Sequence, residues 1–138
     1  MDTKRPKDIA EYKTWLKKNH GVKISERTKT HYCAVVSKAA SDFCATPFWQ
    51  SLKSDIDTIN QKYYLNTKYY LFVENVLPAM ETKDFESFLL KIFRQNVLGN
   101  NNWPNPPEDG WLLPDNWFSR INDLVRTCFV VKYLDGVN

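Results

Sequence analysis

The sequence predicts an α-rich α/β fold in which several helices precede a single strand. Apolar residues recur every three or four positions through most of the first 98 residues, which is the period of an amphipathic helix. Glycine is scarce in that stretch, where Gly21 is the only one. β-Branched and aromatic residues are dense between Val125 and Tyr133, and this composition is typical of a strand.

Start and stop signals predict the limits of the first two helices. Asp8 is a good N-cap for a helix that begins at the next residue, and Gly21 suits the position after its end. A second helix is expected to open at Ser25 or at Thr28, both of which have the side chains that favour a helix start.

The pair Thr46–Pro47 predicts the start of a third helix. Threonine caps a helix well, and proline at the first helical position loses no hydrogen bond that the helix needs. The apolar stripe that follows either breaks at Asn66 or extends to Tyr70.

The segment 71–77 is ambiguous between a helix end and a strand, and Pro78 stops it in either case. Asp84 is then expected to cap an amphipathic helix that ends before Gly99. The following residues, 100–116, are rich in Asn, Pro and Gly, yet they contain two tryptophans. We therefore expect an ordered loop that is held in place by its aromatic rings.

Large apolar side chains on these segments form the expected core. They are Trp15, Phe48, Leu52, Ile56, Phe88, Leu89, Ile92, Phe129 and Val131.

The final strand needs partners for its backbone N–H and C=O groups. It can pair with residues 71–77, with another chain, or with later strands of a sheet that this sequence does not contain. We expect the third arrangement, in which the chain is the first part of an α/β domain cut after its first strand. An unpaired strand also favours a homo-oligomer or a complementing chain.

Composition excludes several classes of protein. No apolar run approaches the roughly 20 residues that cross a bilayer, and the charged N-terminus is not followed by the apolar core of a secretory signal. The three cysteines, Cys33, Cys44 and Cys128, have no metal-ligand spacing. We expect a cytoplasmic protein without a membrane segment, in which the cysteines are reduced and Cys33 and Cys44 are core thiols. We also expect His20 to be a surface side chain and His31 a helix-face side chain.

Positive charge is concentrated at the start of the chain. Residues 1–31 contain nine Lys or Arg and four acidic residues, whereas the remainder contains ten and twelve. Such a region can bind the phosphates of tRNA or the ribosome, or it can be a solvated helix face that keeps the protein dispersed. Both interpretations stay open.

Five side chains form a candidate anion and metal site. Lys83 and Ser87 lie four residues apart at a predicted helix start, where the free N–H groups favour anions. Lys91 and Arg94 follow on the next turns, and Asp123 precedes the predicted strand. A carboxylate beside such cations is a suitable Mg²⁺ ligand when a triphosphate is bound.

The alternative is that these side chains have ordinary structural roles. Asp84 would cap the helix, Lys91 and Arg94 would be solvated, and Asp123 would cap a turn.

The segments ETKDFESFLLKIFRQNV and WFSRINDLVRTCFVVKYLDGVN resemble the opening of the RelA/SpoT-type synthetase domain. That family transfers pyrophosphate from ATP to the 3′-hydroxyl of GDP or GTP, the reaction of the stringent response. The resemblance covers roughly residues 70–138. It implies an N-terminal helical region, 1–70, followed at 71–138 by the first helix, loop and strand of a nucleotidyltransferase-like mixed sheet.

The resemblance implies roles for the candidate residues. Lys83 and Ser87 match positions that bind the phosphates of ATP, and Lys91 and Arg94 match the basic face of the following helix. Asp123 matches the first Mg²⁺ carboxylate and is the expected catalytic residue. ATP and Mg²⁺ are therefore the expected cofactors.

The sequence departs from the family pattern at two positions. Glu81 and Cys128 each stand at a position where the family usually has an arginine. Arg126 is the nearby arginine that could substitute at the second position. The family's later half, with its guanine-stacking tyrosine and its Glu-x-Gln-x-Arg strand, has no counterpart here. The chain alone is thus expected to be catalytically incomplete.

Two functions follow. The first is a fragment of a pyrophosphokinase whose acceptor is a guanine nucleotide, or the 3′ end of tRNA as in toxin-type members. The second is a non-enzymatic helical module for protein interaction or regulation, whose exposed strand adds to the sheet edge of a partner.

Overall fold

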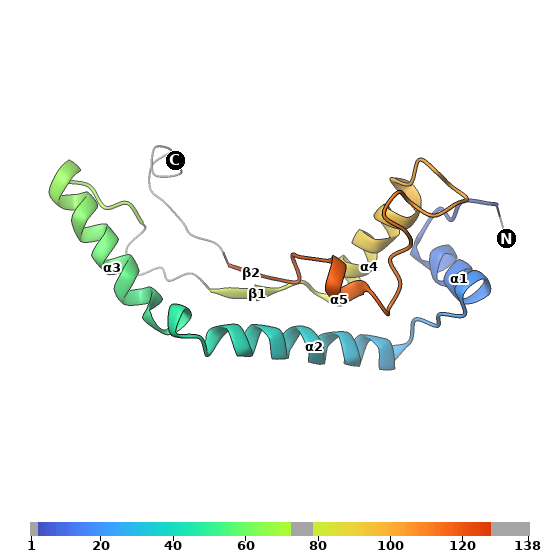
Figure 1. Cartoon of the computed structure of the whole chain (residues 1–138), viewed down its shortest axis with the longest axis horizontal. Helices are drawn as coiled ribbons and strands as arrows, with labels where there is room; N and C mark the ends of the chain where they lie inside the picture. Colours follow the sequence, from blue (N-terminus) through green and yellow to red (C-terminus); the bar gives the residue numbers. More distant parts are fainter. Residues whose placement is uncertain (1–2, 73–78, 128–138) are drawn as a thin grey trace. The chain divides into compact units, whose positions relative to one another are not determined.

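The computed structural model describes residues 3–72 and 79–127 of the 138-residue chain (Figure 1). It is rich in helix, with one small antiparallel sheet, and this confirms the α-rich α/β class. The elements in chain order are α1 (Ile9–His20), α2 (Glu26–Cys44), α3 (Pro47–Thr67), β1 (Met80–Thr82), α4 (Phe85–Phe93), the π-helical turn η1 (Arg94–Leu98), α5 (Trp117–Arg120) and β2 (Val125–Thr127).

The described residues group into two compact units. Unit 1 contains residues 3–36 and 83–124, and unit 2 contains residues 37–72, 79–82 and 125–127. Helix α2 runs through both units. The division at residue 70 inferred from the family resemblance does not coincide with these limits, and it stays a prediction.

Helix α1 begins and ends where the sequence predicts. The carboxylate of Asp8 accepts a hydrogen bond from the backbone N–H of Glu11 at 2.8 Å. At the other end, Gly21 has a left-handed φ of 66°, and its N–H donates to the carbonyl of Lys17 at 3.1 Å. Glycine adopts that φ without the steric cost that a side chain brings.

The predicted starts of the next two helices are also confirmed. Helix α2 begins directly after Ser25, the earlier of the two expected positions. At the start of α3, the hydroxyl of Thr46 accepts a hydrogen bond from the N–H of Trp49 at 3.3 Å. Helix α3 ends at Thr67, close to the shorter of its two expected limits.

Helix α4 changes its hydrogen-bond pattern before it ends. Asp84 caps it by accepting from the N–H of Ser87 at 2.7 Å. The last turn, η1, is π-helical, and the N–H of Gly99 donates to the carbonyl of Arg94 at 2.7 Å. A Cβ atom at Gly99 would lie 3.1 Å from that same oxygen, so the close approach favours glycine here.

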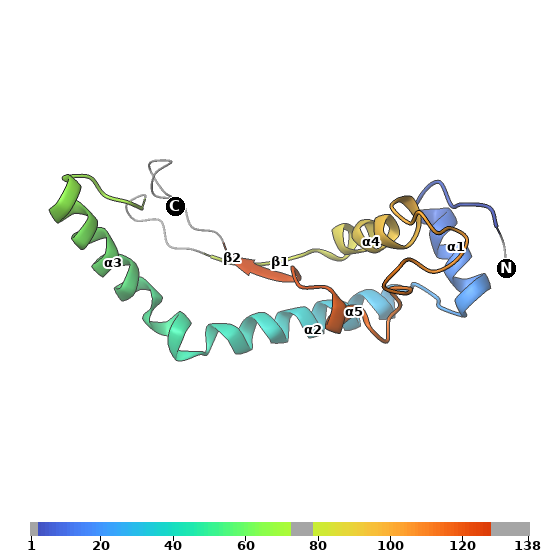
Figure 2. The ribbon, with the colours of Figure 1, turned by 45° about the horizontal axis from the view of Figure 1, so that its top comes forward.

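The core of unit 1 is largely aromatic. The predicted core residues Trp15, Phe88, Leu89 and Ile92 are all buried, which confirms them. Further buried side chains come from α1, α2, α4, η1 and the segment 112–124: Tyr12, Leu16, Tyr32, Val36, Phe85, Phe93, Val97, Leu112, Trp117, Ile121 and Leu124. Helix α1 packs on α4 within this unit, as both ribbon views show (Figures 1 and 2).

Unit 2 confirms the prediction in part. Leu52 and Ile56 are buried, but Phe48 is 58% exposed, so its assignment to the core is wrong. Phe48 lies in the first turn of α3, and its ring meets the edge of Phe43, which is itself 40% exposed. The predicted core residues Phe129 and Val131 lie outside the described residues.

The loop at 100–116 is ordered by aromatic contacts, as predicted. The rings of Trp103 and Trp111 lie 5.2 and 5.1 Å from that of Trp15, measured between centroids. His20 joins this cluster at 5.0 Å from Trp15, so the expectation of a surface histidine is wrong. Burial lowers the pKa of His20. His31 is exposed on α2 and meets the edge of Phe118, as expected for a helix face.

The final strand has a partner within the chain. Strand β2 pairs with β1 in antiparallel register, with Met80 opposite Thr127 and Thr82 opposite Val125. This pairing is none of the three arrangements that the sequence suggested, because a strand as short as β1 leaves no pattern of its own in the sequence. The later strands of a longer sheet stay a prediction. Glu81 and Arg126 face each other across this pair and form an exposed ion pair at 3.4 Å.

The structure describes two of the three cysteines. Cys33 is exposed, one position past the buried Tyr32 on α2, so it is not a core thiol. Cys44 is half-buried, and Cys128 lies outside the described residues, as do the remainder of the predicted strand and most of the segment 71–77. Among the helices in the described ranges, none has the length and apolar character to span a membrane.

Asn96 connects three parts of unit 1 through hydrogen bonds. It lies in η1 with no solvent exposure. Its Nδ2 donates to the hydroxyl of Tyr12 at 2.7 Å and to the carbonyl of Leu112 at 2.8 Å. Its Oδ1 accepts from the N–H of Leu112 at 2.9 Å. Burial also raises the pKa of Tyr12 to about 12, so that hydroxyl is neutral at ordinary pH.

Replacing Asn96 with alanine leaves the Tyr12 hydroxyl and both backbone groups of Leu112 buried without these partners. Since each such group costs about 1–3 kcal/mol, we expect Asn96→Ala to lower the free energy of unfolding by about 3 kcal/mol or more. Tyr12→Phe removes one hydroxyl and leaves Asn96 bonded to Leu112, so it is expected to cost about 1 kcal/mol. Urea denaturation followed by circular dichroism measures both, and equal costs would contradict this role of Asn96.

Candidate functional site

Three of the predicted site residues converge in unit 1. The ammonium group of Lys91 donates to Oδ1 of Asp123 at 2.6 Å. The ammonium group of Lys83 lies 3.3 Å from the other carboxylate oxygen, Oδ2. Each oxygen of Asp123 is thus paired with a different lysine.

The backbone around this cluster is fixed from two sides. Lys83 lies directly before Asp84, the N-cap of α4, and Lys91 lies within the helix. Both side chains reach Asp123. The N–H of Lys83 donates to the carbonyl of Leu124 at 2.8 Å, next to Asp123. Its carbonyl accepts from the hydroxyl of Tyr32 at 2.7 Å. These bonds hold the start of α4 beside the chain that enters β2.

The cluster is partly open to solvent. The side chains of Lys83, Lys91 and Asp123 are 18%, 29% and 41% exposed. The hydrogen bond from Lys91 lowers the pKa of Asp123 below its ordinary value, partial burial opposes that effect, and Lys83 adds to it. Two cations beside one carboxylate leave a net positive charge, which favours a further anion.

Ser87 has a different role from the one predicted. Its N–H donates to Oδ1 of Asp84 at 2.7 Å, and its hydroxyl donates to Oδ2 of Asp84 at 3.1 Å. These hydrogen bonds lower the pKa of Asp84, with that of the Ser87 N–H as the largest cause. A carboxylate therefore occupies the helix start at which the sequence suggested a phosphate.

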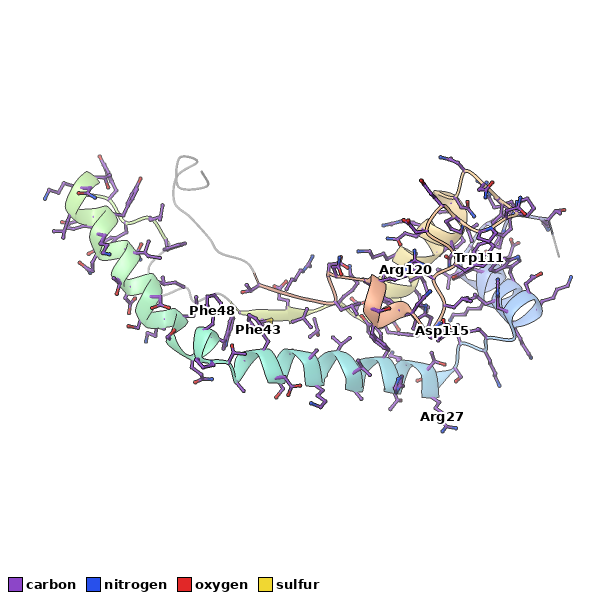
Figure 3. All side chains as sticks on the ribbon, in the orientation of Figure 1. Arg27, Phe43, Phe48, Trp111, Asp115 and Arg120 are labelled. Carbon is purple, nitrogen blue, oxygen red and sulfur yellow. The ribbon has the colours of Figure 1, made fainter. Side chains whose placement is uncertain are left out.

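Arg94 is separated from the cluster as well. It lies in η1 and lines a different hollow of about 540 Å³, together with Arg120, Glu108 and Asp109. Arg120 is held there, since its Nη1 donates to the carbonyls of Gly110 and Trp111. Figure 3 shows Arg120 and Trp111 within this part of unit 1. The structure therefore brings together three of the five predicted side chains.

The sequence also allowed ordinary structural roles for Asp84, Lys91, Arg94 and Asp123. The structure confirms such roles for two of them. Asp84 does cap α4, and Arg94 is exposed. Lys91 is not simply solvated, because it forms the 2.6 Å pair with Asp123, and that pair also gives Asp123 a partner other than a turn.

Asp123 is the carboxylate of this cluster that can ligate a metal. Over residues 3–72 and 79–127, no group of three or more His, Cys, Asp or Glu side chains is placed to hold a metal ion. Mg²⁺ binds through one or two carboxylates when substrate phosphates and water supply its other ligands. The donor set therefore fits a metal that arrives with a phosphate ligand, rather than a metal held by protein alone.

Sequence reasoning missed Tyr32 as part of the site. Its position on the apolar face of α2 could be predicted from helical spacing, and it is indeed buried. Its hydrogen bond to Lys83, 51 residues away, left no local signal in the sequence. Burial raises the pKa of Tyr32, so its hydroxyl keeps the proton that it donates.

Comparisons of the chain with protein-family models, with curated proteins and with solved structures found no match.

Acidification should weaken the fold through Asp123. Its pKa is below the ordinary 3.8 in the folded state, so the unfolded chain takes up this proton first as the pH falls. The contribution of Asp123 is complete above about pH 4 and is lost as the pH falls through the folded pKa. We expect Asp123→Asn to reduce the difference between the free energies of unfolding at pH 6 and pH 3.

The matched control for this prediction is Asp115→Asn, at an exposed position in the same unit. Denaturant titrations at both pH values should give this variant the same pH 6 to pH 3 difference as the unchanged protein. An unchanged difference in Asp123→Asn would show that the ion pairs contribute nothing to acid stability.

Proposed function

We propose that this chain binds ATP together with Mg²⁺ and forms the donor half of a pyrophosphotransferase of the RelA/SpoT type. The observation that carries the proposal is the convergence of Lys83 and Lys91 on Asp123. Their order in the sequence, with Lys83 before a helix, Lys91 within it and an aspartate before the strand, is part of the pattern on which the resemblance depends.

Exchange of partners supports this proposal. Without a ligand, two ammonium groups neutralise one carboxylate. A triphosphate with Mg²⁺ would supply a new partner for each group, because Lys83 and Lys91 would donate to phosphate oxygens and Asp123 would hold the metal. The partial exposure of all three side chains gives a ligand access to them.

The proposed reaction is transfer of pyrophosphate from ATP to a hydroxyl group. The acceptor oxygen forms a bond with the β-phosphorus, and the bond from that phosphorus to the oxygen bridging to the α-phosphate breaks. AMP leaves with the electron pair, and the hydroxyl proton is lost to solvent. Lys83 and Lys91 would neutralise phosphate charge, and Asp123 would orient the metal.

We assign no acceptor site to the described residues. By the family resemblance the acceptor is the 3′-hydroxyl of GDP, GTP or a tRNA. Most of the catalysis of phosphoryl transfer comes from positioning donor and acceptor together. A chain that binds the donor alone therefore lacks most of it. The proposal for this chain by itself is therefore binding of the donor, with transfer depending on a second, acceptor-binding part.

A calorimetric titration tests the donor site. We expect Lys83→Ala and Lys91→Ala each to weaken binding of ATP with Mg²⁺ about tenfold, since a hydrogen bond to a charged group contributes about 1.5–3 kcal/mol. Asp123→Asn should weaken binding with Mg²⁺ but not binding of ATP in EDTA, because the two lysines then lose a competing anion. If Asp123 is a metal ligand, its replacement weakens binding only when Mg²⁺ is present. If Asp123 is purely structural, its replacement has the same effect with Mg²⁺ and in EDTA.

Lys53→Ala is the matched control, because Lys53 is an exposed lysine on α3 and lies in unit 2. It should bind ATP with Mg²⁺ as the unchanged protein does. Binding that is insensitive to Lys83→Ala and to Asp123→Asn would overturn the proposal.

One observation favours a second candidate function, a non-enzymatic interaction module. Large apolar side chains at the end of α2, on α3 and just after it are between 37% and 68% exposed: Phe43, Phe48, Ile59, Tyr64, Leu65 and Tyr69. Figure 3 shows Phe43 and Phe48 close together at the junction of α2 and α3. Exposed apolar surface of this kind is typical of protein contacts, including contacts with a second copy of the chain. This candidate requires no nucleotide, so the same titration separates the two.

A further inference from the structure

A hollow beside the first turns of α1 has an excess of positive charge. Its volume is about 370 Å³, and it is lined by three cationic side chains, Lys4, Arg5 and Lys18, and by one acidic side chain, Glu11. Pro6, Trp15 and the short side chains of α1 complete its wall. The Lys83–Asp123–Lys91 cluster contributes no residue to it.

Arg5 is held in position by the loop that follows η1. Its Nη2 donates to the carbonyl of Asn100 at 3.2 Å. Its guanidinium carbon lies 5.9 Å from the centroid of the Trp103 ring, within the range of a cation–π contact. The indole N–H of Trp103 in turn donates to the carbonyl of Thr3 at 2.9 Å. A guanidinium has five N–H donors, so an ordered Arg5 has further donors for a ligand.

The acidic residue of the hollow is engaged in capping the helix. Glu11 accepts a hydrogen bond at Oε2 from the N–H of Lys7 at 2.8 Å, while its own N–H donates to Asp8. The carboxylate is thereby directed to the backbone before α1. The charge of the hollow stays positive, and a planar guanidinium beside ammonium groups suits phosphate oxygens.

Positive charge continues beyond the hollow along the same helix. Lys7, Lys13 and Lys17 are exposed on α1 and on the segment that leads into it. A mononucleotide would contact the hollow alone, whereas a polyanion would also contact these lysines. We infer that this hollow and the adjoining face of α1 bind the phosphodiester groups of a nucleic acid strand. The inference is independent of the proposed ATP site.

Fluorescence anisotropy with a labelled 12-nucleotide RNA tests this inference. We expect Arg5→Ala/Lys18→Ala to weaken binding at least tenfold. The slope of log K against log salt concentration should fall by about 0.7 for each lost phosphate contact. Lys18→Glu, which leaves the contacts of Arg5 with Asn100 and Trp103 in place, should weaken binding by a similar factor. Thermal unfolding of each variant shows whether the fold is retained.

Lys53→Ala/Lys62→Ala on α3 is the matched control, because it removes the same charge from exposed positions in unit 2. It should change the affinity less than twofold. DNA of the same sequence shows whether the strand must be RNA, since either one satisfies the inference. The inference would be overturned if the control pair weakened binding as much as Arg5→Ala/Lys18→Ala does. It would also be overturned if the protein bound neither RNA nor DNA, or bound inorganic triphosphate but no nucleic acid strand.

Discussion

The carboxylate of Asp123, held between two lysines, is the interaction on which the arrangement of the site depends. Lys83 directly precedes the N-cap of α4, Lys91 lies within that helix, and Asp123 lies 32 residues beyond Lys91 in the sequence. This contact joins the charged side chains at the start of α4 to the chain that leads into β2. The backbone bond between Lys83 and Leu124 and the hydroxyl of Tyr32 reinforce the same junction. Structure and proposed chemistry thus depend on the same three charged groups.

The two anion sites that we propose in unit 1 differ in chemistry. At the first, Asp123 lies between the cations and can exchange them for a metal, which suits a ligand that carries both phosphate and Mg²⁺. At the hollow beside α1, three cationic residues line the wall and the carboxylate of Glu11 accepts from the N–H of Lys7, which suits a phosphate group that binds without a metal. The start of α4, by contrast, is already occupied by Asp84, so its free N–H groups do not form a third anion site.

Local signals in the sequence predicted local structure well. The caps at Asp8, Thr46 and Asp84 are determined by residues within one turn, and the structure confirms each of them. Contacts between distant segments could not be predicted in this way. The exposure of Phe48, the partner of the Tyr32 hydroxyl and the pairing of a three-residue strand all depend on which segments meet, and that information is not contained in any short window of sequence.

Paramagnetic broadening of backbone NMR signals tests the central claim most directly. With ATP and Mn²⁺ in place of Mg²⁺, the account predicts that the amides of Asp123 and Leu124 lose most intensity, and that Asp123→Asn abolishes the effect. The lysines at the start and middle of α4 should shift when ATP is added. Broadening centred on Glu108 and Asp109, or spread evenly over the acidic residues, would contradict a metal–triphosphate site at Asp123.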